Sequence, residues 1–176
     1  MPILPPSDVP GGLQRVSTGA LPDPVDIEGL LAEAHRRYRD VDDGTVADYI
    51  PALAEAPSEA FGACIAGVGG TLFSVGDARV EFSIQSVSKP FVFALVCDAI
   101  GHDVAQEKLG VNSTGLPFNS VMAIELSEDR TLNPMVNAGA IATTSLVPGA
   151  TSEERWQFVL EGLSRFAGRE LVLDRD

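Results

Sequence analysis

Residues 85–101 read Gln85-Ser86-Val87-Ser88-Lys89-Pro90, then an apolar run from Phe91 to Ile100, and then Gly101. The run is too long for a typical strand and stops at a glycine, which favours a buried helix. Proline fits only the first turn of a helix, so Pro90 places the helix start beside Ser86 and Lys89. The chain therefore carries a Ser-x-x-Lys pair at the beginning of a buried helix.

The spacing of Ser86 and Lys89 suits nucleophilic catalysis. Residues three apart on a helical turn share a face, so Lys89 can reach the Ser86 hydroxyl. A neutral lysine can take the serine proton, and free N–H groups at a helix start can hold a developing oxyanion. The plain structural alternative is an N-capping serine followed by a solvated lysine. Lysine occurs only at 89 and 108, which makes a chance match less frequent.

Upstream of this pair, the sequence predicts a helix and then extended segments. Apolar residues recur at helical spacing from about Asp26 to Tyr38. The run from Phe61 to Val68, the turn signal Gly69-Gly70 and the segment Thr71 to Val75 predict a β-hairpin. Residues 80–84 predict a further short strand.

Downstream, the sequence predicts a loop and two more helices. Residues 110–120 are loop-like, and a helix of small residues is expected from Met135 to Leu146. The last helix begins at a capping box of Thr151 and Glu154, carries Trp156 on its core face and ends at Gly168. A strand-like segment follows at 170–173. The order of helix, strands and helices predicts an α+β fold.

Composition narrows the classes of function. The net charge of −13 and the sequence pI near 4.4 disfavour binding to nucleic acid or to an anionic membrane. No apolar run is long enough to span a membrane, and the first residues lack the plan of a secretory signal. Cys64 and Cys97 lie in apolar runs and are expected to be buried and unpaired. With only His35 and His102 as histidines, we expect no metal site and no cofactor. The scarce cysteines, the lack of a membrane-spanning run and the lack of a secretory signal together predict a reducing, cytoplasmic compartment.

Four blocks resemble the serine-dependent glutaminase family, whose members have the penicillin-recognising, β-lactamase-like fold. They are GTVADYIPALA at 44–54, FSIQSVSKPF at 82–91, STGLPFN at 113–119 and NPMVNAGAI at 133–141, and they stand in the family's order and spacing. The resemblance covers residues 26–176. It implies an α+β fold of the β-lactamase/DD-peptidase type and hydrolysis of L-glutamine to L-glutamate and ammonia through an acyl-serine.

The resemblance also implies roles for individual residues. Ser86 matches the family's nucleophile, Lys89 its general base, and Tyr49 a tyrosine that hydrogen-bonds near that pair. Gln85, Ser86 and Asn137 match residues that contact the substrate. For two of these an ordinary structural explanation stands beside the functional one. Tyr49 would be a half-buried packing residue, and Asn137 a polar helix residue that bonds to a loop. Asn133, which precedes Pro134, is expected to form a turn.

The chain departs from the family in length. The family's later segments supply a glutamate, a second asparagine, further tyrosines and a K-S-G-type strand, none of which occurs here. We therefore expect a flexible tail over 1–25 and a partial, incomplete catalytic domain over 26–176, with activity impaired by truncation. The complete protein is expected to be a homo-oligomer. Two alternatives stay open: another Ser-x-x-Lys hydrolase of the same fold that acts on a lactam, and a non-catalytic fragment or interaction module.

Overall fold

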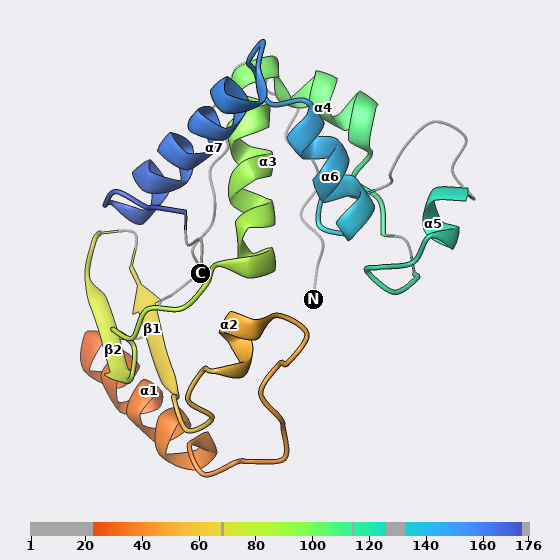
Figure 1. The fold of residues 1–176 in the computed structure, drawn as a ribbon. Helices are drawn as coiled ribbons and strands as arrows, with labels where there is room; N and C mark the ends of the chain where they lie inside the picture. Colours follow the sequence, from red (N-terminus) through yellow and green to blue (C-terminus); the bar gives the residue numbers. More distant parts are fainter. Residues whose placement is uncertain (1–22, 68, 114, 126–132, 174–176) are drawn as a thin grey trace, which may run out of the picture. The chain divides into compact units, whose positions relative to one another are not determined.

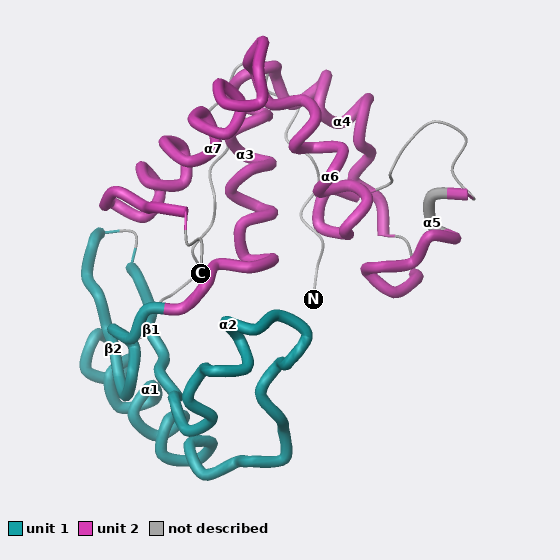
Figure 2. The backbone as a smooth tube through the Cα atoms, in the orientation of Figure 1, with its two compact units in different colours: residues 1–81 teal, residues 82–176 magenta. Residues whose placement is uncertain are grey.

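The computed structural model describes residues 23–67, 69–113, 115–125 and 133–173. The chain divides into two compact units, residues 1–81 and residues 82–176 (Figure 2). Most of the predicted tail lies outside the described residues. The predicted extent of a single catalytic domain, 26–176, stays a prediction.

Unit 1 begins with helix α1, Pro24–Tyr38, which confirms the predicted first helix. The helix starts two residues earlier than the sequence pattern suggested, because Asp23 caps it. The Asp23 carboxylate accepts a hydrogen bond of 3.1 Å from the Val25 N–H, and Pro24 occupies the first turn, where its missing N–H costs nothing. Leu31 is the buried residue of α1.

Strands β1, Gly62–Ala66, and β2, Leu72–Gly76, form the predicted antiparallel hairpin (Figure 1). In its register Ile65 faces Phe73, and Phe73 is buried on the face that carries α1. His35 of α1 contacts Phe61, the residue before β1. Its Nε2 lies 3.1 Å from the Phe61 carbonyl oxygen, and its ring stacks on the Phe61 ring. Gly76 fits beneath His35 because a Cβ there would lie 2.2 Å from Nε2.

The strand predicted over residues 80–84 is wrong. In the described residues the sheet consists of β1 and β2 only. The Val80 N–H bonds back to the Asp77 carbonyl in a turn, and Ile84 already has helical dihedral angles, φ −64° and ψ −29°. The chain therefore forms a turn and then enters a helix where the sequence pattern predicted a strand. A short helix α2, Pro51–Ala54, also occurs in unit 1 and was not predicted.

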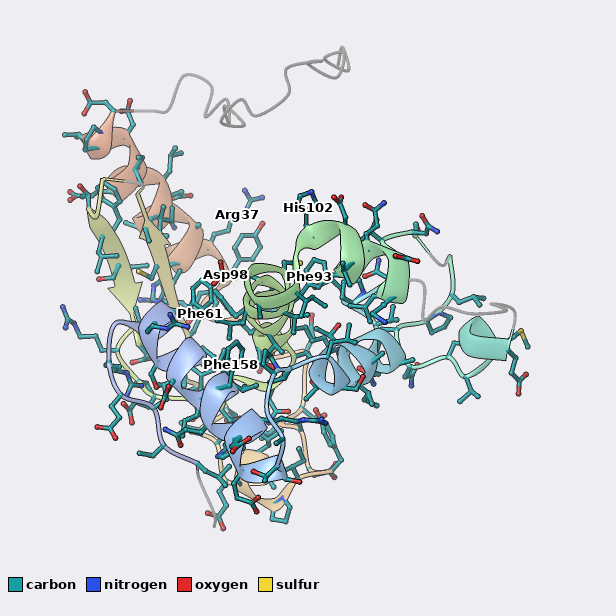
Figure 3. The ribbon with its side chains drawn as sticks, turned by 90° about the horizontal axis from the view of Figure 1, so that it is seen from above. Arg37, Phe61, Phe93, Asp98, His102 and Phe158 are labelled. Carbon is teal, nitrogen blue, oxygen red and sulfur yellow. The ribbon has the colours of Figure 1, made fainter. Side chains whose placement is uncertain are left out.

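Unit 2 is built around helix α3, Ser88–Ile100, which confirms the predicted buried helix. It packs against α4 (His102–Leu109), α6 (Asn137–Ser145) and α7 (Ser152–Ala167) (Figure 1). Val96, Val147 and Val159 form the centre of the core, and Phe158, labelled in Figure 3, packs against them from α7. Gly162 of α7 allows close approach, since a Cβ there would lie 2.3 Å from a methyl carbon of Leu95.

The capping box of α7 is present as predicted, with Thr151 and Glu154 each bonding the other's backbone, and Gly168 ends the helix at φ 65°. Trp156, which was expected to pack in the core, is 45% exposed. The strand-like segment 170–173 is irregular instead, and its Leu171 N–H donates to the Ser164 hydroxyl. Helix α4 was not predicted, and α5 (Met122–Glu125) is a single turn within the region beyond the predicted loop.

Both cysteines are free. Cys64 was expected to be buried and is exposed, because alternate residues of β1 point to opposite faces and Cys64 lies on the face away from Phe73. Cys97 of α3 is half-buried, and this burial raises the pKa of its thiol. Among the helices within the described parts of the chain, none has the length and apolar character to cross a membrane.

Candidate active site

Ser86 lies in a 3₁₀ turn, η1 (Gln85–Val87), that runs directly into α3. Gln85 has φ 45° and is the one residue other than glycine with a positive φ in the described part of the chain. Such a conformation costs about 1–3 kcal/mol and persists only where the surroundings hold it. The turn therefore presents the Ser86 hydroxyl at the helix entrance through a strained backbone.

Hydrogen bonds on both sides of Ser86 hold this turn. The Ser88 hydroxyl donates to the Gln85 carbonyl oxygen at 2.8 Å, and the Gln85 side-chain amide donates to the Ser83 hydroxyl at 3.1 Å. The capping positions are Ile84 for η1 and Val87 for α3, and neither helix has a side-chain cap. Ser86 is thus not an N-capping serine, and its side chain is exposed.

The N–H groups at the helix start are partly occupied. The Val87 N–H donates to the Ile84 carbonyl at 3.0 Å, and the Ser88 N–H donates to the Gln85 carbonyl. The sequence suggested that helix-start N–H groups could hold an oxyanion, but these two already have acceptors. An oxyanion at this place would need the N–H of Ser86 or donors from elsewhere.

Lys89 is half-buried and has two partners for its ammonium group. Its Nζ donates a hydrogen bond of 2.7 Å to Asn137 Oδ1 and lies 5.7 Å from the centroid of the Phe118 ring. Across the described residues, no hydrogen bond joins Lys89 Nζ to Ser86 Oγ. Lys89 is therefore not a freely solvated lysine, and the distance between the two groups stays a prediction.

Asn137 is the first residue of α6, and its backbone is held by the loop that precedes α5. Its backbone N–H donates to the Phe118 carbonyl oxygen at 2.9 Å. The side chain bonds to Lys89 rather than to a loop, so the plain structural explanation for Asn137 does not hold. The helix begins later than the predicted Met135, since Val136 is still extended.

Asn133 forms the predicted turn in front of α6. Its Oδ1 accepts a hydrogen bond of 2.7 Å from the Met135 N–H, and its side-chain amide donates to the Asn112 carbonyl at 3.0 Å. Gly139 lets this turn lie against the helix, because a Cβ there would fall 1.8 Å from the Asn133 carbonyl oxygen. The turn thus sets the direction in which α6 presents Asn137.

Tyr49 belongs to unit 1, in the irregular segment before α2, and is 76% exposed. It is therefore not a packing residue within that unit.

Phe118 was not singled out from the sequence, although its ring contacts Lys89 and its backbone carbonyl accepts the Asn137 N–H. The sequence feature that could have pointed to Phe118 is an aromatic residue in a loop that contains glycine and proline. No group of three or more His, Cys, Asp or Glu residues that could hold a metal ion is found among the described residues.

Comparisons with known proteins agree in pointing to one family. Residues 44–176 match the family profile described as Glutaminase. The chain is 58% identical over 166 residues to glutaminase 2 of Yersinia pestis, covering 94% of this chain and 49% of that protein. It is 52% identical over 133 residues to a glutaminase of Brucella abortus (strain S19), covering 76% and 42%.

Solved structures show the same similarity. One described as a probable glutaminase superposes with a TM-score of 0.83 at 38% identity, covering 87% of this chain and 50% of that chain. A structure described as Mglu in its glutamate form gives a TM-score of 0.73 at 37% identity, covering 84% and 34%. The chain spans about half the length of the curated relatives it matches.

Proposed function

The chain belongs to the glutaminase family, and on that premise we propose that the protein hydrolyses L-glutamine to L-glutamate and ammonia, with Ser86 as the nucleophile. The fold supports this proposal, because its structural neighbours are glutaminases of the β-lactamase-like α+β type. The observation that carries it is the Lys89–Asn137 hydrogen bond at the entrance of the helix that follows Ser86.

In the proposed first step, neutral Lys89 takes the proton of the Ser86 hydroxyl while Oγ attacks the side-chain amide carbon of glutamine. A neutral lysine has one lone pair and two N–H donors. One N–H can therefore keep the bond to Asn137 Oδ1 while the lone pair faces Ser86. This arrangement supports a base that is held in place without losing its ability to accept a proton.

In the second step, the tetrahedral intermediate collapses. The C–N bond breaks, Lys89 returns the proton to the leaving nitrogen, and ammonia departs, leaving a γ-glutamyl ester on Ser86. Water then adds to the ester carbonyl while Lys89 accepts one of its protons. The bond between the γ-carbonyl carbon and Ser86 Oγ breaks, and Lys89 returns the proton to Oγ, which releases L-glutamate and regenerates Ser86. Because the Val87 and Ser88 N–H groups already have acceptors, the Ser86 N–H is the proposed oxyanion donor of this segment.

Asn137 and Gln85 are proposed to contact the substrate. The Oδ1 atom of Asn137 is taken by Lys89, which leaves its side-chain N–H groups to donate to a substrate carboxylate. Gln85 is exposed beside Ser86, and its side-chain amide donates to the Ser83 hydroxyl. A hydrogen-bonding role for Tyr49 in catalysis is proposed from the family resemblance alone. A solved relative is described in its glutamate form, which supports glutamate as the product bound at such a site.

The location of the protein is proposed from its charge, and its assembly from the family resemblance. The net charge of −13 opposes binding to nucleic acid and anionic membranes, and we place the protein in the cytoplasm. A homo-oligomer of the complete protein is proposed from the family resemblance alone.

The test measures ammonia release from L-glutamine by two proteins. One is the 176-residue chain. The other, called the fusion below, carries residues 1–176 followed by the part of Yersinia pestis glutaminase 2 beyond the aligned region. We expect turnover by the fusion and little or none by the chain alone, because substrate contacts and flanking strands contribute much of an enzyme's rate.

Two outcomes would contradict the proposal. Hydrolysis of a penicillin by the fusion, without ammonia release from glutamine, would favour a lactam-hydrolysing enzyme of the same fold. Inactivity of the fusion on both substrates, alongside activity of the intact Yersinia pestis protein, would favour a non-catalytic role for this chain. L-asparagine serves as the matched substrate control, since it is one methylene shorter and should react far more slowly.

A further inference from the structure

We infer that Phe118 is a positioning residue for Lys89: its ring holds the lysine's ammonium group while its backbone holds Asn137. This inference rests on the proposed function, in which Lys89 is the general base. Phe118 lies within the loop before α5 and outside the helices that form the core of unit 2.

The exposure of Phe118 argues against a packing role. Its side chain is 60% exposed, although a large aromatic ring normally gains by burial. The partner identified for the ring is Lys89 Nζ, 5.7 Å from its centroid, which is within the range of a cation–π interaction. The ring is therefore placed where it contacts a cation and not where it fills the core.

Phe118, Asn137 and Lys89 form a closed set of contacts. The Phe118 carbonyl accepts the Asn137 N–H at 2.9 Å, Asn137 Oδ1 accepts from Lys89 Nζ at 2.7 Å, and Lys89 Nζ faces the Phe118 ring. A lysine side chain is long and has many rotamers, so one partner alone leaves its end group mobile. Two partners that approach the ammonium from a loop and from a helix restrict it to one place beside the Ser86 turn.

The two functions of Phe118 can be separated by substitution. The bond to Asn137 uses the backbone carbonyl and persists whatever the side chain is. Phe118→Leu removes the aromatic face but keeps an apolar side chain, whereas Phe118→Tyr keeps the aromatic face. Because the ring is exposed, both variants should unfold at the temperature of the unchanged protein. Phe166→Leu, which alters another exposed phenylalanine of unit 2, is the matched control.

The first measurement is an NMR spectrum of the 176-residue chain with ¹³Cε-labelled lysine. The chain has only two lysines, so Lys89 is compared directly with exposed Lys108. We expect the Lys89 ε-methylene protons upfield of those of Lys108, because the carbon that carries them is bonded to Nζ, which lies over the Phe118 ring. The difference should vanish in Phe118→Leu and remain in Phe118→Tyr and Phe166→Leu. Coincident lysine signals in the unchanged chain, or a difference that survives Phe118→Leu, would overturn the inference.

The second measurement is the rate at which a fluorophosphonate, a serine-directed electrophile, labels Ser86. Lys89 becomes an ammonium as it takes the Ser86 proton, and the ring stabilises this charged form. Phe118→Leu should therefore slow labelling by roughly 2- to 30-fold, the range that a lost cation–π contact implies, and Phe118→Tyr should restore it. Equal rates in Phe118→Leu and the unchanged chain, with labelling abolished by Ser86→Ala, would refute the positioning role of Phe118 but not the role of Ser86 as nucleophile. Labelling that survives Ser86→Ala, or none in the unchanged chain, would count against the proposed nucleophile, and the NMR result then decides the inference.

Discussion

The Lys89 ammonium donates a 2.7 Å hydrogen bond to Asn137 Oδ1, and the two residues lie 48 positions apart in the sequence. The bond joins the first turn of α3 to the first residue of α6, two helices that pack against each other. The starts of α3 and α6 therefore meet at Lys89. The strained turn that carries Ser86 leads into α3.

Asn137→Ala should reduce turnover of the fusion about 10- to 100-fold. Lys89 is an ammonium once it has taken the Ser86 proton, and a hydrogen bond to a charged group is typically worth about 1.5–3 kcal/mol. The loss combines a less restricted Lys89 with a missing substrate contact. The measurement is ammonia release from L-glutamine. Thr144→Ala, an exposed change on the same helix that removes only a bond to the Ala140 carbonyl, is the control and should leave turnover unchanged. Full activity of Asn137→Ala would remove Asn137 from the site.

Gly139→Ala should destabilise unit 2 by about 1–3 kcal/mol or more, because the added Cβ would collide with the backbone carbonyl of Asn133. Trp156, the single tryptophan, lies in α7 and reports on unit 2, so the measurement is urea unfolding followed by its fluorescence. Gly29→Ala is the control. Its position in α1 has nothing within 4 Å, and the change should leave the Trp156 transition where it was. Equal unfolding midpoints for Gly139→Ala and the unchanged chain would mean that the Asn133 turn does not pack closely against α6.

The two cysteines should react with iodoacetamide at clearly different rates. Cys64 is exposed on β1, whereas Cys97 is half-buried and its thiol pKa is raised by that burial. A raised pKa leaves less thiolate at a given pH, so the rate at Cys97 should keep rising as the pH passes the ordinary thiol value. Peptide mapping by mass spectrometry after timed alkylation gives both rates. Urea should abolish the difference, and faster modification of Cys97 in the folded chain would contradict the burial of this residue.

Local patterns predicted those elements whose signals are contained in their own residues. The apolar run after Pro90 became α3, the Gly69-Gly70 turn became a hairpin, and the capping box at Thr151 started α7. In each case a cap, a turn or a period specifies the element without distant help. The strand predicted at 80–84 failed because a turn at Asp77 and the helical entry at Ile84 leave it no partner strand.

The contacts of the site could not be predicted from spacing. Sequence reasoning selected Ser86 and Lys89 from their separation, but the partner that Lys89 contacts comes from α6 and its aromatic neighbour from a loop. These pairings depend on how the Asn133 turn and Gly139 bring the loop against α6, which no local pattern encodes. Burial was equally non-local. Cys64 lies in an apolar run and Trp156 lies on the apolar face expected for α7, and both are nevertheless exposed.

The most direct test of Ser86 as the nucleophile is ammonia release from L-glutamine by the fusion and by three serine variants. Ser83→Ala and Ser88→Ala are the matched controls. Both serines flank Ser86, and their hydroxyls bond to Gln85: the Ser83 hydroxyl accepts from the Gln85 side-chain amide, and the Ser88 hydroxyl donates to the Gln85 carbonyl oxygen. Ser86→Ala should lower turnover by at least about 10³-fold, since no other group can form the acyl intermediate. The controls should stay within about tenfold of the unchanged fusion, because each loses one neutral hydrogen bond. Turnover by Ser86→Ala equal to that of the controls would contradict the account.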